Sequence, residues 1–176
     1  MRRVMIIGGA GSGKSTLARR LGKRLDLPVV HIDTLFWEPG WVMAEDRTFQ
    51  DRLAKAVEGD TWIMDGNYSG SWAGRLARAD TVIFLDIPTW RRFWRTVLRT
   101  FRSYGRSRKD LGRDCPERFS LHFHLGWVLQ YRRRGRLKAL DLMREEGPAG
   151  HLARHHLKGT ASIERFLAGL RRNSCG

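Results

Sequence analysis

Residues 8–15 read Gly8-Gly9-Ala10-Gly11-Ser12-Gly13-Lys14-Ser15 and fit the pattern G-x-x-x-x-G-K-[ST]. Glycines let the backbone turn tightly, so that successive N–H groups can point into one cavity and hold phosphate oxygens. A helix that begins at such a loop adds the positive end of its dipole. The stretch therefore predicts a polyphosphate site, with Lys14 reaching the β- and γ-phosphates and the Ser15 hydroxyl binding Mg²⁺.

The residues on either side of the loop supply the strand and the helix that this motif needs. Residues 3–7 form an apolar run typical of a buried strand, and residues 14–25 carry Leu17, Leu21 and Leu25 at a helical spacing. The alternative is a glycine-rich turn in an unrelated α/β protein. The G-x-G-x-x-G pattern of dinucleotide-binding loops does not fit at either possible start.

The rest of the chain alternates between apolar runs of strand length and two-faced segments of helix length. We expect strands at residues 3–7, 27–32, 61–64, 81–87 and 151–156, helices at 14–25, 45–57, 71–78, 89–104, 117–132, 136–146 and 160–171, and a loop at 34–41. This order predicts an α/β protein: a three-layer P-loop NTPase fold with a five-stranded parallel sheet.

Composition narrows the class of protein. Of 176 residues, 33 are lysine or arginine and 18 are aspartate or glutamate, a formal net charge of +15. This balance favours phosphorylated or polyanionic partners, nucleic acid among them; a merely basic surface is the alternative. No apolar run approaches the ~20 residues of a membrane span, so we expect no membrane partner.

The cysteines and histidines indicate no metal site. Cys115 and Cys175 form no C-x-x-C pair, which favours a reduced, cytoplasmic protein without a disulfide framework or a zinc site. The histidines lack the spacing of metal ligands. We expect all six to be structural or on the surface: His31, His122, His124, His151, His155 and His156.

Three aspartates stand at the carboxyl ends of expected strands, where ligands bind in parallel α/β sheets. Asp33 is our candidate for the catalytic carboxylate on the substrate side; the alternative is a helix cap or loop tie. Asp65 can act through Mg²⁺-bound water or on the substrate. Asp86, which is close to Pro88, is expected to cap the next element.

A basic flap is expected after the helix at 89–104. Residues 105–116 are polar and basic, and Arg106, Arg108 and Arg113 could close over a transferring phosphate. We assign a catalytic role to Arg106 and Arg113; the alternative is a solvated basic loop. The arginine face of the helix at 89–104 is expected on the surface, or in a nucleic-acid patch.

Aromatic residues gather in the sequence around the ends of the second and third expected strands. Trp37, Trp41, Trp62 and Tyr68 could wall a pocket for a planar ligand. Ordinary core and loop packing is the alternative.

Several of these motifs together resemble a known group. The glycine loop, the Asp65-Gly66 dipeptide, the run Phe84-Leu85-Asp86-Ile87-Pro88 and the arginine-bearing flap resemble the adenylate kinase-like nucleoside and nucleotide kinases. More closely, three runs resemble the P-loop proteins called topology modulation proteins: His31-Ile32-Asp33 with Trp37-Glu38-Pro39-Gly40-Trp41, then Trp62-Ile63-Met64-Asp65-Gly66-Asn67-Tyr68, and then Asp114-Cys115-Pro116-Glu117-Arg118.

The resemblance implies a single P-loop kinase-like domain over residues 1–176, with a substrate-binding insert near 34–60 and a short lid near 103–118. It implies that ATP phosphates are bound by Gly8, Gly9, Ala10, Gly11, Ser12, Gly13, Lys14, Ser15 and Thr16. Mg²⁺ would be held by Ser15 and Asp65. The acceptor would be bound by Asp33, Trp41, Asp65, Asn67 and Tyr68, and Arg75 would hold an acceptor phosphate.

The function expected from these features is a Mg-ATP-dependent kinase. Its acceptor would be a small molecule, a nucleoside or nucleotide. One alternative is a nucleic-acid-binding ATPase or a polynucleotide 5′-kinase acting on DNA, which the charge favours. A nucleotide-dependent switch with negligible turnover is the third possibility.

Overall fold

A computed structural model describes residues 1–108, 110–112, 114–120, 126, 128–133, 135–144 and 152–170. Its central sheet contains β1 (Arg3–Gly8), β2 (Val29–His31), β5 (Trp62–Asp65), β6 (Thr81–Asp86) and β7 (Ala153–Lys158). The strands lie in the order β2-β5-β1-β6-β7 and all neighbours pair in parallel. The predicted five-stranded parallel sheet is confirmed.

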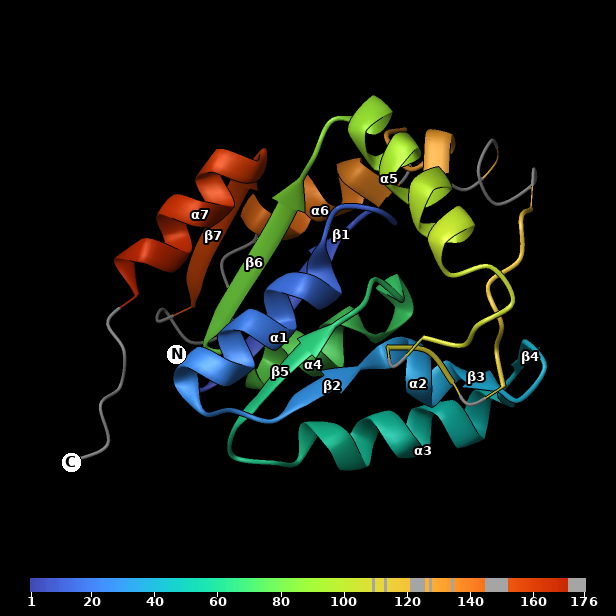
Figure 1. Cartoon of the computed structure of the whole chain (residues 1–176). Helices are drawn as coiled ribbons and strands as arrows, with labels where there is room; N and C mark the ends of the chain where they lie inside the picture. The colour runs from blue at the N-terminus through green and yellow to red at the C-terminus, as the bar shows by residue number, and fades with distance from the viewer. Residues whose placement is uncertain are drawn as a thin grey trace.

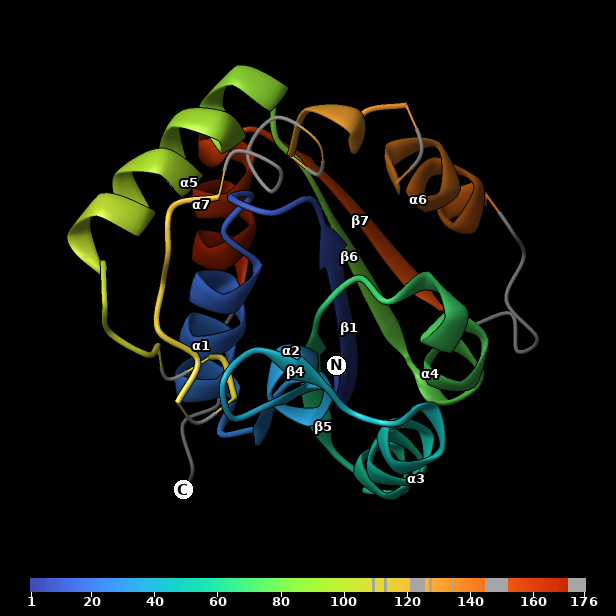
Figure 2. The ribbon, with the colours of Figure 1, turned by 90° about the vertical axis from the view of Figure 1, so that its right-hand side faces the viewer.

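Helices cover both faces of this sheet, and Figure 2 shows the three layers from the side. One face carries α1 (Lys14–Leu25) and α7 (Thr160–Gly169), which pack Leu17, Leu21 and Ile163 onto the central strands. The other face carries α3 (Asp46–Val57), α4 (Trp72–Arg78) and α6 (Gly135–Arg144). The central strands are buried on both sides, which is why they are continuous apolar runs in the sequence.

The segment expected as an insert has more structure than the predicted loop. Residues expected to be irregular form the short helix α2 (Ile32–Phe36) and a two-stranded hairpin of β3 (Trp37–Glu38) and β4 (Val42–Met43). Gly40, with φ +79°, lies in the hairpin turn, where a left-handed backbone favours glycine. The Pro39-Gly40 turn was therefore expected correctly, whereas the flanking pairing was not.

Helix α5 (Thr89–Arg102) lies beyond the carboxyl end of β6 (Figure 1). Its orientation corrects part of the expectation for its arginine face: Arg91, Arg95 and Arg102 are exposed as expected, whereas Arg92 is buried and Arg99 is partly buried. Arg92, Thr96 and Thr100 are buried, whereas Trp90 and Trp94 are exposed. The helix turns this polar face inward because the glycine loop packs against it. A Cβ at Gly11 would lie 2.4 Å from the Arg92 carbonyl oxygen.

The expected lid, residues 103–118, follows α5. Isolated bridges join Tyr104 to Glu117 and Ser107 to Pro116, so the segment returns beside itself. The helix expected at 117–132 is wrong at its start, because Glu117 bonds to the lid backbone and residues 118–120 are not helical. Residues 121–125 of that expected helix lie outside the described residues.

The short 3-10 helix η1 (Ser69–Ser71) precedes α4 and completes the element order. Across the described parts of the chain, no helix combines the length and apolarity needed to cross a membrane.

Candidate active site

The glycine loop joins β1 to α1 with the backbone that the motif predicts. Gly11 and Gly13 have φ values of +76° and +97°, which side chains other than glycine rarely adopt. A Cβ added at Gly13 would meet nothing within 4 Å, so Gly13 borders open space. The loop therefore keeps the space and the amide directions that phosphates need.

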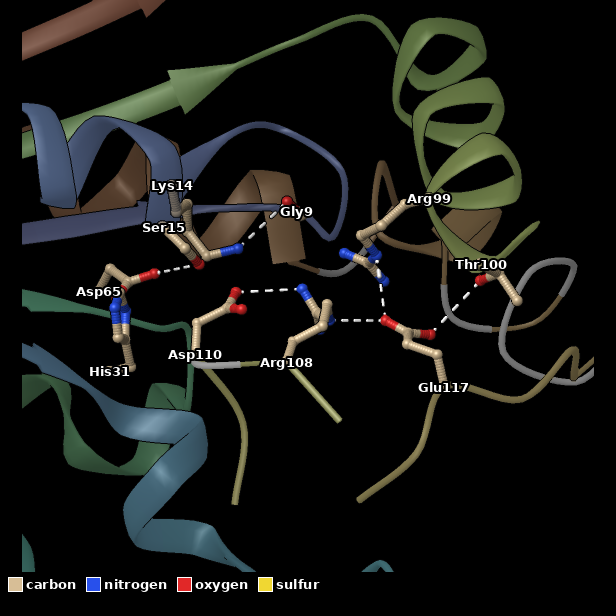
Figure 3. A network of polar contacts seen from close by, with 10 residues as sticks. All are labelled: Gly9, Lys14, Ser15, His31, Asp65, Arg99, Thr100, Arg108, Asp110 and Glu117. Atoms are coloured by element: carbon tan, nitrogen blue, oxygen red, sulfur yellow. Dashed lines mark hydrogen bonds and ion pairs between the residues drawn. The ribbon is translucent and has the colours of Figure 1, made fainter. Parts of the chain in front are cut away.

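Lys14 lies across the mouth of this loop. Its Nζ donates a hydrogen bond to the Gly9 carbonyl oxygen at 3.3 Å (Figure 3). Burial lowers the pKa of Lys14, and the nearby Asp65 and Asp33 carboxylates offset only part of that effect. A bound phosphate would stabilise the charged form of Lys14, which burial disfavours.

Ser15 and Asp65 meet as the sequence expects. The Ser15 hydroxyl donates to Asp65 Oδ2 at 2.7 Å, and these oxygens come from the start of α1 and the end of β5. Oxygen ligands of this kind suit Mg²⁺, which takes one or two carboxylates together with substrate phosphates. The residues present thus fit a magnesium ion.

His31 contributes to this pair. Its Nδ1 contacts Asp65 Oδ1, and the two residues are register partners on neighbouring strands. Burial lowers the pKa of His31, but the hydrogen bond and the charge of Asp65 outweigh it, so the net pKa is raised. His31 therefore orients Asp65, a role that the sequence analysis missed.

Asp33 lies in the first turn of α2, facing the same region. Burial raises the pKa of its carboxyl group above the usual range, although Lys14 and a hydrogen bond from Tyr68 act in the opposite direction. The Tyr68 hydroxyl donates to Asp33 Oδ1 at 3.0 Å. A partly buried carboxylate of raised pKa near a lysine is suited to accept a proton.

The turn after β5 is held by buried polar contacts. Arg75 is fully buried and donates to the Gly66 and Asn67 carbonyl oxygens at 3.0 and 2.7 Å. Burial lowers the pKa of Arg75 to about 9. The expectation that Arg75 holds an acceptor phosphate is thus corrected, because its guanidinium binds the backbone of the turn.

Asn67 and Tyr68 have different positions in this turn. The Asn67 side-chain oxygen accepts a hydrogen bond from the Gly8 N–H at 3.0 Å, so Asn67 braces the glycine loop. Tyr68 has a φ of +30°, an uncommon backbone for an aromatic residue, and its ring packs between Phe36 and Phe49. This backbone directs its hydroxyl to Asp33.

A network of arginines and carboxylates lies beside the glycine loop (Figure 3). Arg99 from α5 and Arg108 from the lid form ion pairs with the same Glu117 oxygen, at 3.2 and 2.7 Å. Arg108 also donates to Asp110 at 3.0 Å, and Thr100 donates to Glu117 at 3.4 Å. Two arginines are thereby fixed near the position of the expected phosphates.

Asp110 is a lid residue that lies near Ser15. Burial raises the pKa of its carboxyl group, but the charge of Arg108 is foremost among the effects that outweigh it, so the net pKa is lowered. Asp110 is thus an ionised carboxylate beside the hydroxyl expected to face Mg²⁺ and phosphate.

The lid and the insert are joined directly. Trp41 Nε1 donates to the Pro116 carbonyl oxygen at 2.8 Å, and the Gly40 N–H donates to the Asp114 carbonyl oxygen at 2.9 Å. Cys115 is buried and its Sγ donates to the Glu38 carbonyl oxygen at 3.3 Å. In this structure Trp41 therefore joins the insert to the lid.

The remaining expected site residues lie elsewhere. Arg106 is exposed, and its backbone pairs with Glu117, whereas the Arg108 side chain joins Asp110 and Glu117 in the network of Figure 3. The expected catalytic Arg113 lies outside the described residues. Asp86 forms ion pairs with Arg136 and His156 at 2.8 and 2.9 Å, in keeping with a structural role.

Sequence reasoning missed three members of the site: His31, Arg99 and Asp110. His31 lies at the end of an expected strand. Pairing of that strand with the one that ends at Asp65 would have placed His31 next to Asp65. Arg99 follows Arg92 by seven residues, two turns of a helix, and a buried Arg92 would have put both near the glycine loop. For Asp110 the flap sequence held no such signal.

Comparison with known proteins supports the fold. No protein-family model and no curated protein matches the sequence. Among solved structures, a shikimate kinase from Acinetobacter baumannii in complex with shikimate matches with a TM-score of 0.59 and 13% identity, over 96% of this chain and 89% of that one. The chain has the fold of the P-loop kinases.

Two further structures agree. A sugar kinase from Janibacter sp. HTCC2649 matches with a TM-score of 0.51 and 16% identity, over 98% of this chain and 96% of that one. A shikimate kinase from Bacteroides thetaiotaomicron matches with a TM-score of 0.51 and 15% identity, over 95% and 94% of the two chains. At these identities the likeness concerns the fold.

Proposed function

We propose that the protein is a Mg-ATP-dependent kinase that transfers the γ-phosphoryl group to a hydroxyl or phosphate of a small acceptor, a nucleoside or nucleotide. The observation that carries the proposal is the position of Asp33. Its partly buried carboxyl group accepts a hydrogen bond from Tyr68 and lies within electrostatic reach of Lys14, the expected phosphate-binding lysine. A site that only bound nucleotide would not need a second carboxylate of this kind.

In the proposed reaction, the glycine loop and Lys14 hold the ATP phosphates. Asp33 accepts the proton of the acceptor hydroxyl as the acceptor oxygen bonds to the γ-phosphorus and the bond to ADP breaks. Mg²⁺, held by Ser15 and Asp65, would neutralise charge on the phosphates. Arg99 and Arg108 stabilise the charge of the transferring group once it replaces Glu117 and Asp110 as their partner.

The acceptor would enter between α2 and the turn after β5. Tyr68 orients Asp33 through its hydroxyl, and Arg75 and Asn67 keep that turn in place from below. The named solved structures are kinases of shikimate and of sugar, which makes a small hydroxylated acceptor a reasonable class for this chain. The likeness to the topology modulation proteins stays a prediction.

The test is ATP turnover with Mg²⁺ against a panel of acceptors: nucleosides, nucleoside monophosphates, small hydroxylated metabolites, and DNA or RNA 5′-ends. Stimulation by one small acceptor, lost in Lys14→Ala, supports the proposal and names the acceptor. Asp33→Asn should retain ATP binding and lose turnover. Stimulation by nucleic-acid ends alone, or turnover that no acceptor changes, contradicts the proposal.

A further inference from the structure

The outward face of α5 carries large apolar side chains that the protein does not cover. Trp90, Trp94, Leu98 and Phe101 are 62%, 57%, 50% and 68% exposed, and Tyr104 just beyond the helix is also exposed. They follow one another by three or four residues and therefore form one stripe along the helix. Scattered apolar residues on a surface need no explanation, but a continuous stripe indicates an interaction site.

Within α5 the stripe is bordered by positive charge and by no negative charge. The exposed arginines Arg91, Arg95 and Arg102 lie beside it, and α5 contains no aspartate or glutamate. Figures 1 and 2 show α5 at the outer edge of the molecule. The Phe101 ring lies 6.1 Å from the Phe119 ring and Arg95 donates to the Thr160 hydroxyl at 3.0 Å, but the apolar side chains of the stripe stay at least half exposed. A partner that fits this face must combine an apolar layer, into which the side chains can insert, with negative charge.

We propose that the outward face of α5 docks on an anionic phospholipid surface. Trp, Phe and Leu would insert at the boundary of headgroups and acyl chains, and the arginines would reach the lipid phosphates. The expectation of no membrane partner rested on the lack of a spanning segment, and an interfacial helix does not need one. The opposite face of the same helix contributes Arg99 to the site, so docking leaves the site clear.

Two other occupants fit the surface less well. A second copy placed symmetrically on this stripe would bring two rows of arginines together without a carboxylate on either helix. A single-stranded nucleic acid would need flat aromatic faces, yet Leu98 lies mid-stripe and the Arg91 guanidinium lies 5.0 Å from the Trp90 ring centroid.

The test is co-sedimentation of the full chain with vesicles of phosphatidylserine and phosphatidylcholine, and with phosphatidylcholine alone. We expect binding that requires phosphatidylserine and falls about tenfold or more in Trp94→Ser/Leu98→Ser. The matched control is Val42→Ser/Met43→Ser, which removes side chains 58% and 65% exposed on β4 and should bind as the unmodified chain does.

A second pair of variants separates local from overall charge. Arg91→Gln/Arg102→Gln should weaken binding, whereas Arg47→Gln/Lys55→Gln, which removes the same charge from the exposed face of α3, should weaken it far less. Thermal unfolding verifies that each variant folds. If Trp94→Ser/Leu98→Ser does not fold, Phe101→Ser alone probes the same surface.

Four results would overturn the proposal. The first is that binding to vesicles does not depend on phosphatidylserine, and the second is that both charge variants lose binding equally while the apolar variants have no effect. The third is a dimer in sedimentation that dissociates in Trp94→Ser/Leu98→Ser. The fourth is oligonucleotide binding that is lost in that variant, with no vesicle binding. The third assigns the face to a second copy, and the fourth assigns it to nucleic acid.

Discussion

Asp110→Asn tests whether the Asp110 carboxylate of the lid lies close enough to the expected phosphate position to repel a bound phosphate. The Asp110 carboxylate is ionised, pairs with Arg108 at 3.0 Å and lies beside Ser15. Two unit charges about 5 Å apart repel by roughly 3 kcal/mol at an effective dielectric constant of about 20. The Arg108 partner and solvent reduce this, so we expect the variant to bind metal-free ATP more tightly by about 1–2 kcal/mol, or roughly 5- to 30-fold.

The assay is titration calorimetry of ATP in the presence of a chelator and, separately, with Mg²⁺. With Mg²⁺ the gain should shrink, because the cation offsets the same repulsion. The matched control is Asp114→Asn, which removes the same charge from an exposed position of the same lid and should change the affinity little. Unchanged or weaker binding of metal-free ATP by Asp110→Asn would refute the reasoning.

Three further predictions concern single contacts. Asp33→Asn should lower turnover by about 10²- to 10⁴-fold. Because the pKa of Asp33 is raised in the folded protein, ionising Asp33 destabilises the fold as pH rises, so the variant should also have a higher melting temperature at neutral pH. In the unmodified enzyme, turnover should fall with decreasing pH at values above the usual carboxyl range. Trp41→Phe loses the 2.8 Å bond to Pro116, so proteolysis of the lid should be roughly fivefold faster. Hydrogen bonds from Arg136 and His156 outweigh burial and lower the pKa of Asp86. Asp86→Asn should therefore lower the free energy of unfolding, measured with denaturant at neutral pH, by about 1–3 kcal/mol. This difference should disappear as pH falls through the lowered pKa.

The fold could be predicted because each of its main elements has a local signal. The glycine loop, the apolar strand runs and the spacing of Leu17, Leu21 and Leu25 depend on neighbours in the sequence. Glycines at 11 and 13 have the backbone that the motif requires. Five strands and the meeting of Ser15 with Asp65 followed from these signals and from the rule for parallel sheets.

The parts that failed depend on contacts between distant residues. Arg75 could not be told from a phosphate ligand, because only the structure shows the two carbonyl oxygens that it binds. The burial of Arg92 on α5 was missed because packing against the glycine loop, rather than the apolarity of the helix, decides which residues turn inward. The hairpin at 37–43 has strands of two residues, too short for a periodic signal.

The contacts between lid and insert have a kinetic consequence. Gly40, Trp41 and Glu38 bind the lid at Asp114, Pro116 and Cys115, so neither segment can open far without the other. If the nucleotide lies under the lid and the acceptor beside the insert, both must leave through one shared opening event. The two products should then dissociate at rates that change together, and a single slow step should limit turnover for every acceptor the enzyme takes.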